Sequence, residues 1–168
     1  MSFRVSLINK CSLICGAICA AGYIFTVSIC NSPIDFMHKI NKSEILPPIW
    51  LFIILSTAFC FLMGIAAGAV IYATASRLNI GDYERSAYKG GLFFLSAYYL
   101  FLAWYPVIFG GEHLFIAIGI MSLCLVSSLI CALCWFNSYP TFSPIFVLLF
   151  SCWCVYILIA IIIIFFNN

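Results

Sequence analysis

Five long apolar stretches, separated by short groups of charged or turn-forming residues, make up most of the chain. A helix needs about 20 apolar residues to cross the hydrocarbon core of a bilayer. The apolar run after His113 is too long for one crossing, and the turn-forming segment from Asn137 to Pro144 divides it. The pattern therefore predicts membrane helices at roughly residues 11–32, 47–75, 90–109, 114–136 and 142–166.

These stretches predict an all-α membrane protein, a five-transmembrane-helix bundle that forms a single integral-membrane domain of residues 1–168. None of them alternates apolar and polar positions as a membrane β-strand does. The first stretch follows two positive residues, Arg4 and Lys10, as in a signal peptide. Its apolar run is longer than a usual signal-peptide core, so we expect a retained helix.

The composition agrees with this fold class. Hydrophobic residues make up 66% of the chain and charged residues only 7%, whereas a soluble domain carries about 25% charged residues. Such a chain cannot cover a surface that faces water, so the expected partner is the lipid bilayer. The formal net charge of +2 is too small to indicate a nucleic-acid partner.

The distribution of Lys and Arg predicts the orientation of the chain. With five crossings, the N-terminus and the even-numbered loops share one side, with the basic residues Arg4, Lys10, Arg77, Arg85 and Lys89. The other side carries Lys39 and Lys42. This bias predicts a cytoplasmic N-terminus in a bacterial cell membrane. A mitochondrial outer membrane, the alternative for a eukaryotic protein, would not follow the rule so directly.

The predicted helices contain no acidic residue, lysine, arginine or histidine. Ion-coupled carriers usually hold their cargo with such groups, so that class is disfavoured. Hydrolysis is disfavoured for the same reason, and we expect neither an enzyme nor catalytic residues. A binding site in the form of an apolar cavity lined by aromatic side chains is still compatible with the sequence. Most of the 17 phenylalanines are nevertheless expected to face lipid.

Ten cysteines raise the question of a metal site or disulfides. Cys11, Cys15 and Cys19 recur every four residues and share one helix face. A zinc site would need converging ligands on a loop scaffold, and both histidines fall in predicted loops. We therefore interpret the cysteines as small apolar packing residues and expect no metal.

Two glycines in the second stretch, Gly64 and Gly68, have the spacing that lets helices approach closely. They pack either against a neighbouring helix of the same bundle, the interpretation we favour, or against a second copy in a homodimer.

The second stretch begins with Pro47-Pro48-Ile49-Trp50-Leu51-Phe52. Two prolines suit the first turn of a helix, where their missing N–H groups would be unpaired. Tryptophan suits the boundary between lipid and water. The third stretch ends in Trp104-Tyr105-Pro106, and Pro106 is expected to kink or end that helix.

These segments, their order and the five spans resemble the TspO/MBR family, the translocator proteins or peripheral-type benzodiazepine receptors. The resemblance covers roughly residues 11–168. The positions that match the family pattern are Pro47, Pro48, Trp50, Phe52, Thr57, Met63, Gly64, Ala66, Trp104, Phe109, Gly110 and the closing Phe166-Asn167.

The chain also departs from the family pattern, mostly by replacing polar and tryptophan positions with apolar residues. The family tryptophan before Thr57 is Ser56 here. The other departures fall at Phe36, Cys60, Ala97, Phe101, Leu148, Leu149, Cys152 (with Trp153 beside it) and Ala160.

The resemblance implies a five-helix bundle, often a homodimer, that binds tetrapyrroles such as protoporphyrin IX or haem, and in some members cholesterol. No cofactor is required. The implied pocket lies among the first, second, third and fifth helices, under the first loop. Ligand-binding positions carried over from the family are Trp50, Trp104, Pro47, Pro48, Tyr156 and Ile159.

The resemblance thus implies binding of a hydrophobic planar ligand, a tetrapyrrole or a sterol, by a sensor, chaperone or transporter. Some bacterial members are reported to degrade protoporphyrin with pocket tryptophans, a reaction that Ser56 disfavours here. The departures support an alternative: a structural or assembly protein of the membrane with a decayed ligand pocket.

Overall fold

The computed structural model describes residues 2–30, 47–76, 81–109, 113–138 and 142–167. These residues form five α-helices and no strand: α1 Ser2–Ile29, α3 Ile49–Ser76, α4 Gly81–Phe109, α5 Leu114–Ser138 and α6 Phe142–Asn167. Each helix contains a segment long and apolar enough to cross a membrane, at Lys10–Ile29, Ile49–Ala75, Arg85–Phe109, Leu114–Phe136 and Phe142–Phe166. The prediction of a multi-pass integral membrane protein built from five helices is confirmed.

Two helices begin earlier than the spans predicted for them. α1 begins at Ser2 rather than at residue 11, and α4 begins at Gly81 rather than at residue 90. The predicted spans stop at the nearest charged residue, but lysine and arginine are good helix formers, so a helix can continue through them out of the lipid. Arg85 and Lys89 therefore lie on α4. Some predictions fall on residues that the structure does not describe. They concern the first loop as a cover of the pocket, with Phe36, Lys39 and Lys42, and the positions Arg77 and Gly110.

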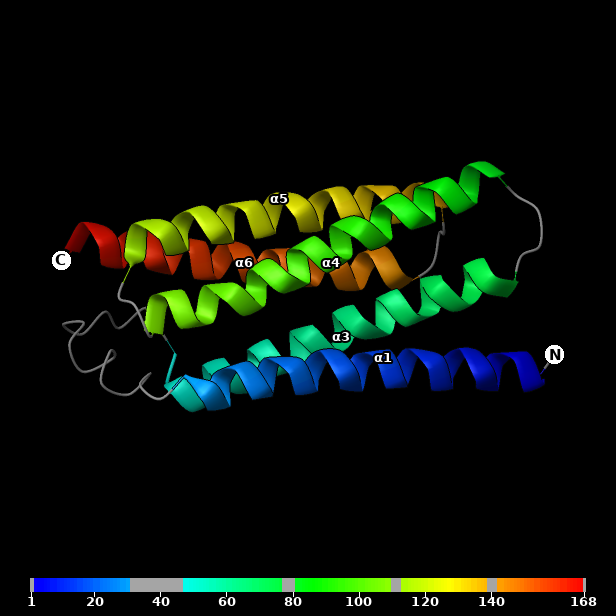
Figure 1. Ribbon diagram of the computed structural model, residues 1–168, viewed down its shortest axis with the longest axis horizontal. Helices are drawn as coiled ribbons and strands as arrows, with labels where there is room; N and C mark the ends of the chain where they lie inside the picture. Colours follow the sequence, from blue (N-terminus) through cyan, green and yellow to red (C-terminus); the bar gives the residue numbers. More distant parts are fainter. Residues whose placement is uncertain (1, 31–46, 77–80, 110–112, 139–141, 168) are drawn as a thin grey trace.

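The helices form a ring with one loosely closed seam. α1 packs along α3, α3 contacts α6, α6 packs along α5, and α5 packs along α4. On the remaining side, α4 touches α1 and α3 at only a few residues each. Figure 1 shows the α1–α3 pair beside the group of α4, α5 and α6, with the two chain ends at opposite ends of the bundle, as an odd number of crossings requires.

Gly64 and Gly68 explain the close approach of α1 and α3. A Cβ atom at Gly64 would lie 2.6 Å from the carbonyl oxygen of Cys15 and 2.8 Å from the Cα of Gly16. A Cβ at Gly68 would lie 2.7 Å from the Cα of Ser12. These neighbours are backbone atoms of the same chain, so the small-residue face of α3 is occupied by α1.

The two proline motifs lie at the ends of their helices. Pro48 immediately precedes α3, and its carbonyl oxygen accepts hydrogen bonds from the N–H groups of Leu51 (2.9 Å) and Phe52 (3.0 Å). The prolines thus stand just before the first turn rather than in it, a one-residue difference typical of helix boundaries. Pro106 lies inside α4, which ends within one turn of it at Phe109.

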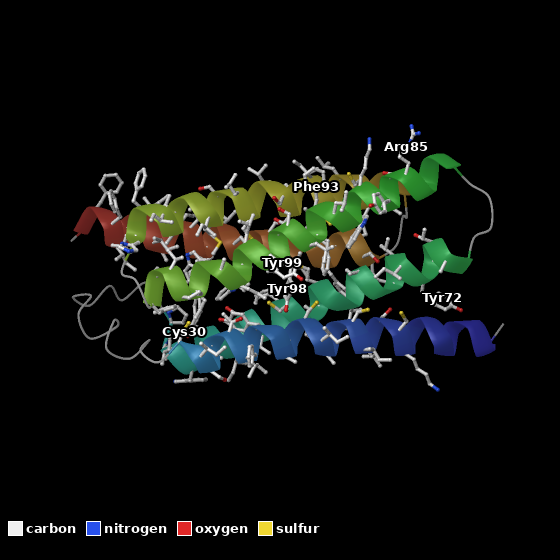
Figure 2. The ribbon with its side chains drawn as sticks, viewed as in Figure 1. Cys30, Tyr72, Arg85, Phe93, Tyr98 and Tyr99 are labelled. Carbon is white, nitrogen blue, oxygen red and sulfur yellow. The ribbon has the colours of Figure 1, made fainter. Side chains whose placement is uncertain are left out.

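Tyr98 bridges the loose seam between α1 and α4. Its hydroxyl donates a hydrogen bond to the carbonyl oxygen of Cys19, 2.8 Å away. Gly22 makes room for this contact, because a Cβ there would overlap the Tyr98 hydroxyl. Figure 2 shows Tyr98 between the ribbon of α4 and the α1–α3 pair, near the middle of the bundle.

Candidate functional site

Trp104 lies at the centre of a group of aromatic side chains between the helices. Only 2% of its surface is exposed. Its ring centroid is 6.0 Å from that of Phe52 on α3, and 6.4 Å and 5.9 Å from those of Phe101 and Phe109 on α4. We call the connected rings that are buried the Trp104 cluster: Tyr23, Phe52, Phe101, Trp104, Tyr105, Phe109, Phe150 and Trp153.

Helical spacing brings these rings together from four helices. On α4, Phe101, Trp104 and Tyr105 stand at positions i, i+3 and i+4, which share one helix face. On α6, Phe150 and Trp153 are three residues apart in the same way. Tyr23 of α1 reaches the α4 rings, with its centroid 5.6 Å from Phe101. The cluster therefore lies among α1, α3, α4 and α6.

A hydrogen bond inside the cluster links α3 to α6. The indole Nε1–H of Trp153 donates to the Ser56 hydroxyl oxygen at 3.1 Å, and both residues are buried. In hydrocarbon an indole N–H without a partner is unfavourable, because no water can replace the bond. Ser56 thus gives the Trp153 N–H a hydrogen-bond partner. From the resemblance, a tryptophan would be expected at the position of Ser56.

A double-mutant cycle is expected to detect this bond. Ser56→Ala and Trp153→Phe should each lower the free energy of unfolding in detergent, and their coupling free energy should be about 0.6–1.7 kcal/mol, the range for hydrogen bonds between membrane helices. Thr57→Ala is the matched control, because the Thr57 hydroxyl donates to Ile53 of its own helix at 2.7 Å. Equal coupling of Trp153 to both positions would contradict the expectation.

Three other polar groups of the cluster have no such partner. The Nε1–H of Trp104 and the hydroxyls of Tyr23 and Tyr105 are buried without a hydrogen-bond partner among the described residues. The rings of Trp104 and Tyr105 are adjacent, with centroids 6.3 Å apart, and the centroids of Tyr23 and Tyr105 are 5.9 Å apart. Buried donors are nearly always satisfied in native proteins. Adjacent unsatisfied donors in an aromatic environment therefore form a place where an acceptor group of a bound molecule would be stabilised.

The cluster includes some of the positions expected from the sequence and leaves others out. Trp104 is at its centre. Tyr156 is half-buried and stacks on Trp153, with ring centroids 5.2 Å apart. Trp50 is 61% exposed and Ile159 is 51% exposed, so neither side chain lies inside the bundle.

The helix period explains these exposed positions. Trp50 is two residues before the buried Phe52, and Ile159 is two residues after the buried Ile157. Two residues are about 200° around a helix, so each pair lies on opposite faces. Pro47 is half-buried and Pro48 exposed, both beside the undescribed first loop. A ligand role of these four residues stays a prediction.

The cluster also contains residues that the sequence did not single out as ligand contacts. Tyr23, Tyr105 and Phe150 are fully buried in it. Tyr105 and Phe101 could have been found from their helical spacing to Trp104. Tyr23 and Phe150 could not, because their place depends on which helices become neighbours.

The described cysteines are all free thiols. Cys124 packs between helices, with its sulfur 3.2 Å from the Ala97 carbonyl oxygen and 3.9 Å from the Cys154 sulfur. The described part of the chain contains no group of three or more His, Cys, Asp and Glu side chains placed to hold a metal ion.

Comparison with known proteins gives one match that covers most of the chain. The sequence model of the TspO/MBR family matches residues 11–166. No curated protein and no solved structure gives a significant match.

Proposed function

Because the chain belongs to the TspO/MBR family, we propose that it binds a hydrophobic planar ligand in the Trp104 cluster. The ligand class that suits the cluster best is a tetrapyrrole such as protoporphyrin IX or haem, with a sterol as the second choice. The protein would act on this ligand as a sensor, chaperone or transporter in the membrane.

The observation that carries the proposal is the pair of buried, unsatisfied donors on Trp104 and Tyr105. A carboxylate or carbonyl oxygen on the ligand would accept hydrogen bonds from both groups. The flat faces of a tetrapyrrole would stack on the surrounding rings, which prefer offset or edge contacts at the spacings found here. An apolar site with a few well-placed polar groups is the usual composition of a small-molecule pocket.

Binding in this place requires the rings to part, because the cluster is closely packed. Phe101 lies edge-on to Phe150 at a centroid distance of 5.0 Å, and both are fully buried. The bundle would open most easily on the side where α4 faces α1 and α3, because few residues touch there. Ligand binding would therefore change the arrangement of α1 relative to α4, as a sensor requires.

The close packing also favours a second candidate function, that of a structural or assembly protein whose pocket has been filled. Phe101, Cys60 and Ala97 stand at polar or tyrosine positions of the family, and all three are fully buried here. We assign no reaction in either case, because the tryptophan position linked to porphyrin degradation is Ser56, whose hydroxyl is taken by Trp153.

Replacing Tyr105 by phenylalanine is expected to separate the two candidates. The change keeps the ring and removes an unsatisfied hydroxyl, so the thermal stability of the ligand-free protein should stay equal or rise. Affinity for protoporphyrin IX should fall by about two- to tenfold, the value of one hydrogen bond. Thermal unfolding of the ligand-free protein measures the stability, and titration of purified protein with protoporphyrin IX, followed by tryptophan quenching, measures the affinity.

Tyr99→Phe is the matched control, because Tyr99 lies on the same helix with its side chain exposed. It should change neither property. Absence of saturable binding by the unaltered protein would reject ligand binding and favour the structural candidate. Displacement of protoporphyrin by cholesterol would show that a sterol competes for the same site.

A further inference from the structure

A groove of about 730 Å³ lies between the C-terminal half of α3 and the N-terminal half of α4. We call it the α3–α4 groove; it is lined by Ala67, Val70, Ile71, Thr74, Ala75, Arg85, Ala87, Tyr88, Gly91, Leu92, Phe94, Leu95 and Trp135. The Trp104 cluster occupies the other end of α4, and Tyr98, bonded to α1, stands between the two regions. The groove is therefore a separate site, with a volume in the range of small-molecule pockets.

The groove opens sideways, toward the lipid. Ile71 on its α3 side and Tyr88 and Leu92 on its α4 side are all more than half exposed. Apart from Thr74 and Arg85 its walls are aliphatic and aromatic, and they lie within the spans Ile49–Ala75, Arg85–Phe109 and Leu114–Phe136. A hollow with apolar walls that faces the hydrocarbon core can receive an acyl chain directly from the bilayer.

Two adjacent glycines shape the α4 wall. A Cβ at Gly90 would overlap the Nε1 and Cδ1 atoms of Trp135, so this glycine lets the α5 indole pack beneath α4. At Gly91 a Cβ would meet nothing within 4 Å. Gly91 therefore borders open space, and a larger side chain there would fill the groove without displacing a neighbour.

Trp135 of α5 lines the groove beside α4. It is 1% exposed, and its Nε1 atom lies against Gly90, which does not itself line the groove. Its position is fixed by stacking with Phe94, at a centroid distance of 6.0 Å, and by the nearby bond from the Ser86 hydroxyl to the Cys134 carbonyl oxygen, 3.0 Å. Trp135 is therefore a rigid part of the wall and a fluorescent reporter of what occupies the groove.

Positive charge marks the end of the groove at the membrane surface. Arg85 lines the groove, is the first residue of the α4 span and is exposed. Lys89, one turn later, is also exposed but does not line the groove. Figure 2 shows the Arg85 side chain reaching outward from α4.

The order of these groups along α4 matches the order of groups in a phospholipid. Gly91, on the groove wall, is six residues beyond Arg85 in the sequence, about 9 Å deeper along the helix axis. A phosphate would therefore lie at Arg85, and an acyl chain along Gly91 and Leu95. Basic sites between membrane helices on the cytoplasmic side characteristically bind anionic head groups.

We propose that the α3–α4 groove binds an anionic phospholipid of the surrounding leaflet, with its phosphate at Arg85 and one acyl chain in the groove. The charge at one end and the lateral opening to lipid favour this occupant over a soluble anion or an uncharged lipid. The site is independent of the Trp104 cluster and of its proposed ligand.

Fluorescence quenching by brominated lipids tests the proposal in the full chain. The Trp50→Phe protein, which lacks the exposed indole, is placed in phosphatidylcholine nanodiscs that contain a small fraction of brominated phosphatidylglycerol or brominated phosphatidylcholine. Phosphatidylglycerol should quench more strongly. Arg85→Gln should reduce that preference by about fivefold, the value of one basic residue at an anionic lipid surface. Gly91→Leu should abolish quenching of Trp135 by both lipids.

The matched controls are Lys10→Gln, an exposed base at the same end of the bundle, and Gly119→Leu, a second helical glycine with nothing within 4 Å of an added Cβ. Neither should alter the preference. Equal quenching by the two lipids, or unchanged quenching in Gly91→Leu, would overturn the proposal. Loss of the preference on adding inorganic phosphate would also overturn it, by assigning the charge to a free anion. Protoporphyrin binding should stay unchanged in Gly91→Leu.

Discussion

Replacing Trp104 by alanine is expected to lower the free energy of unfolding by about 3–5 kcal/mol, the usual loss when a large aromatic side chain leaves a core. Trp104 touches rings from two helices, with Phe52, Phe101 and Phe109 all within 6.4 Å between centroids. These rings cannot all move into the space that the indole leaves. On the proposed function, the same change should also remove saturable binding of protoporphyrin IX, because it deletes both a stacking surface and an unsatisfied donor.

Thermal unfolding in detergent and titration with protoporphyrin measure these two effects. Trp104→Phe keeps most of the packing and removes only the N–H, so it should fold well and still bind more weakly than the unaltered protein. Tyr99→Ala is the control for loss of a large aromatic side chain, because Tyr99 lies on the same helix and is exposed. Unchanged affinity in both Trp104 variants would reject the Trp104 cluster as the ligand site.

The sequence predicted the number, order and approximate limits of the helices, because bilayer thickness sets the length of each apolar run. It did not predict that α4 would extend outward to Gly81. The charged residues up to Lys89 were interpreted as a loop before the span. In the structure the helix continues through them, from Gly81 onward. That extension is what places Arg85 on the wall of the α3–α4 groove.

The candidate site could be predicted only in part. Trp104 was expected in it, and the structure puts Trp104 at the centre of the aromatic cluster. The side chains opposite Trp104 were beyond prediction, because hydrophobic periodicity is weak in helices that are apolar on every face. The contact between Ser56 and Trp153 joins residues far apart in the chain. Such a pair becomes visible only when the neighbours of each helix are known.

The family tryptophan at this position is Ser56 here, and the contact with Trp153 changes the interpretation of that replacement. Taken alone, the substitution indicates loss of a ligand-binding ring. In the structure, an indole from α6 still reaches this level of the bundle, with Phe52 and Phe59 at centroid distances of 5.5 Å and 5.4 Å from Trp153. The site therefore keeps its aromatic character while its tryptophan is supplied by another helix.

Replacing Gly64 by leucine is expected to lower the free energy of unfolding by about 3 kcal/mol, at the upper end of the usual effect of overpacking. Even the Cβ atom would lie 2.6 Å from the Cys15 carbonyl oxygen and 2.8 Å from the Gly16 Cα. Backbone atoms of α1 cannot turn aside as a side chain can, so α1 must move away from α3. This loss outweighs the gain in helix propensity of about 1 kcal/mol on replacing glycine.

Gly119→Leu separates the effect of the contact from that of the residue type. Nothing lies within 4 Å of an added Cβ at Gly119, so this variant should be as stable as the unaltered protein or slightly more stable. Thermal unfolding should be measured together with the mass of the detergent-solubilised protein. If Gly64 served mainly as a dimer contact, Gly64→Leu would halve that mass and leave the unfolding of the monomer unchanged. Because α1 already occupies this face of α3, we expect the opposite: lower stability with no change in the number of copies.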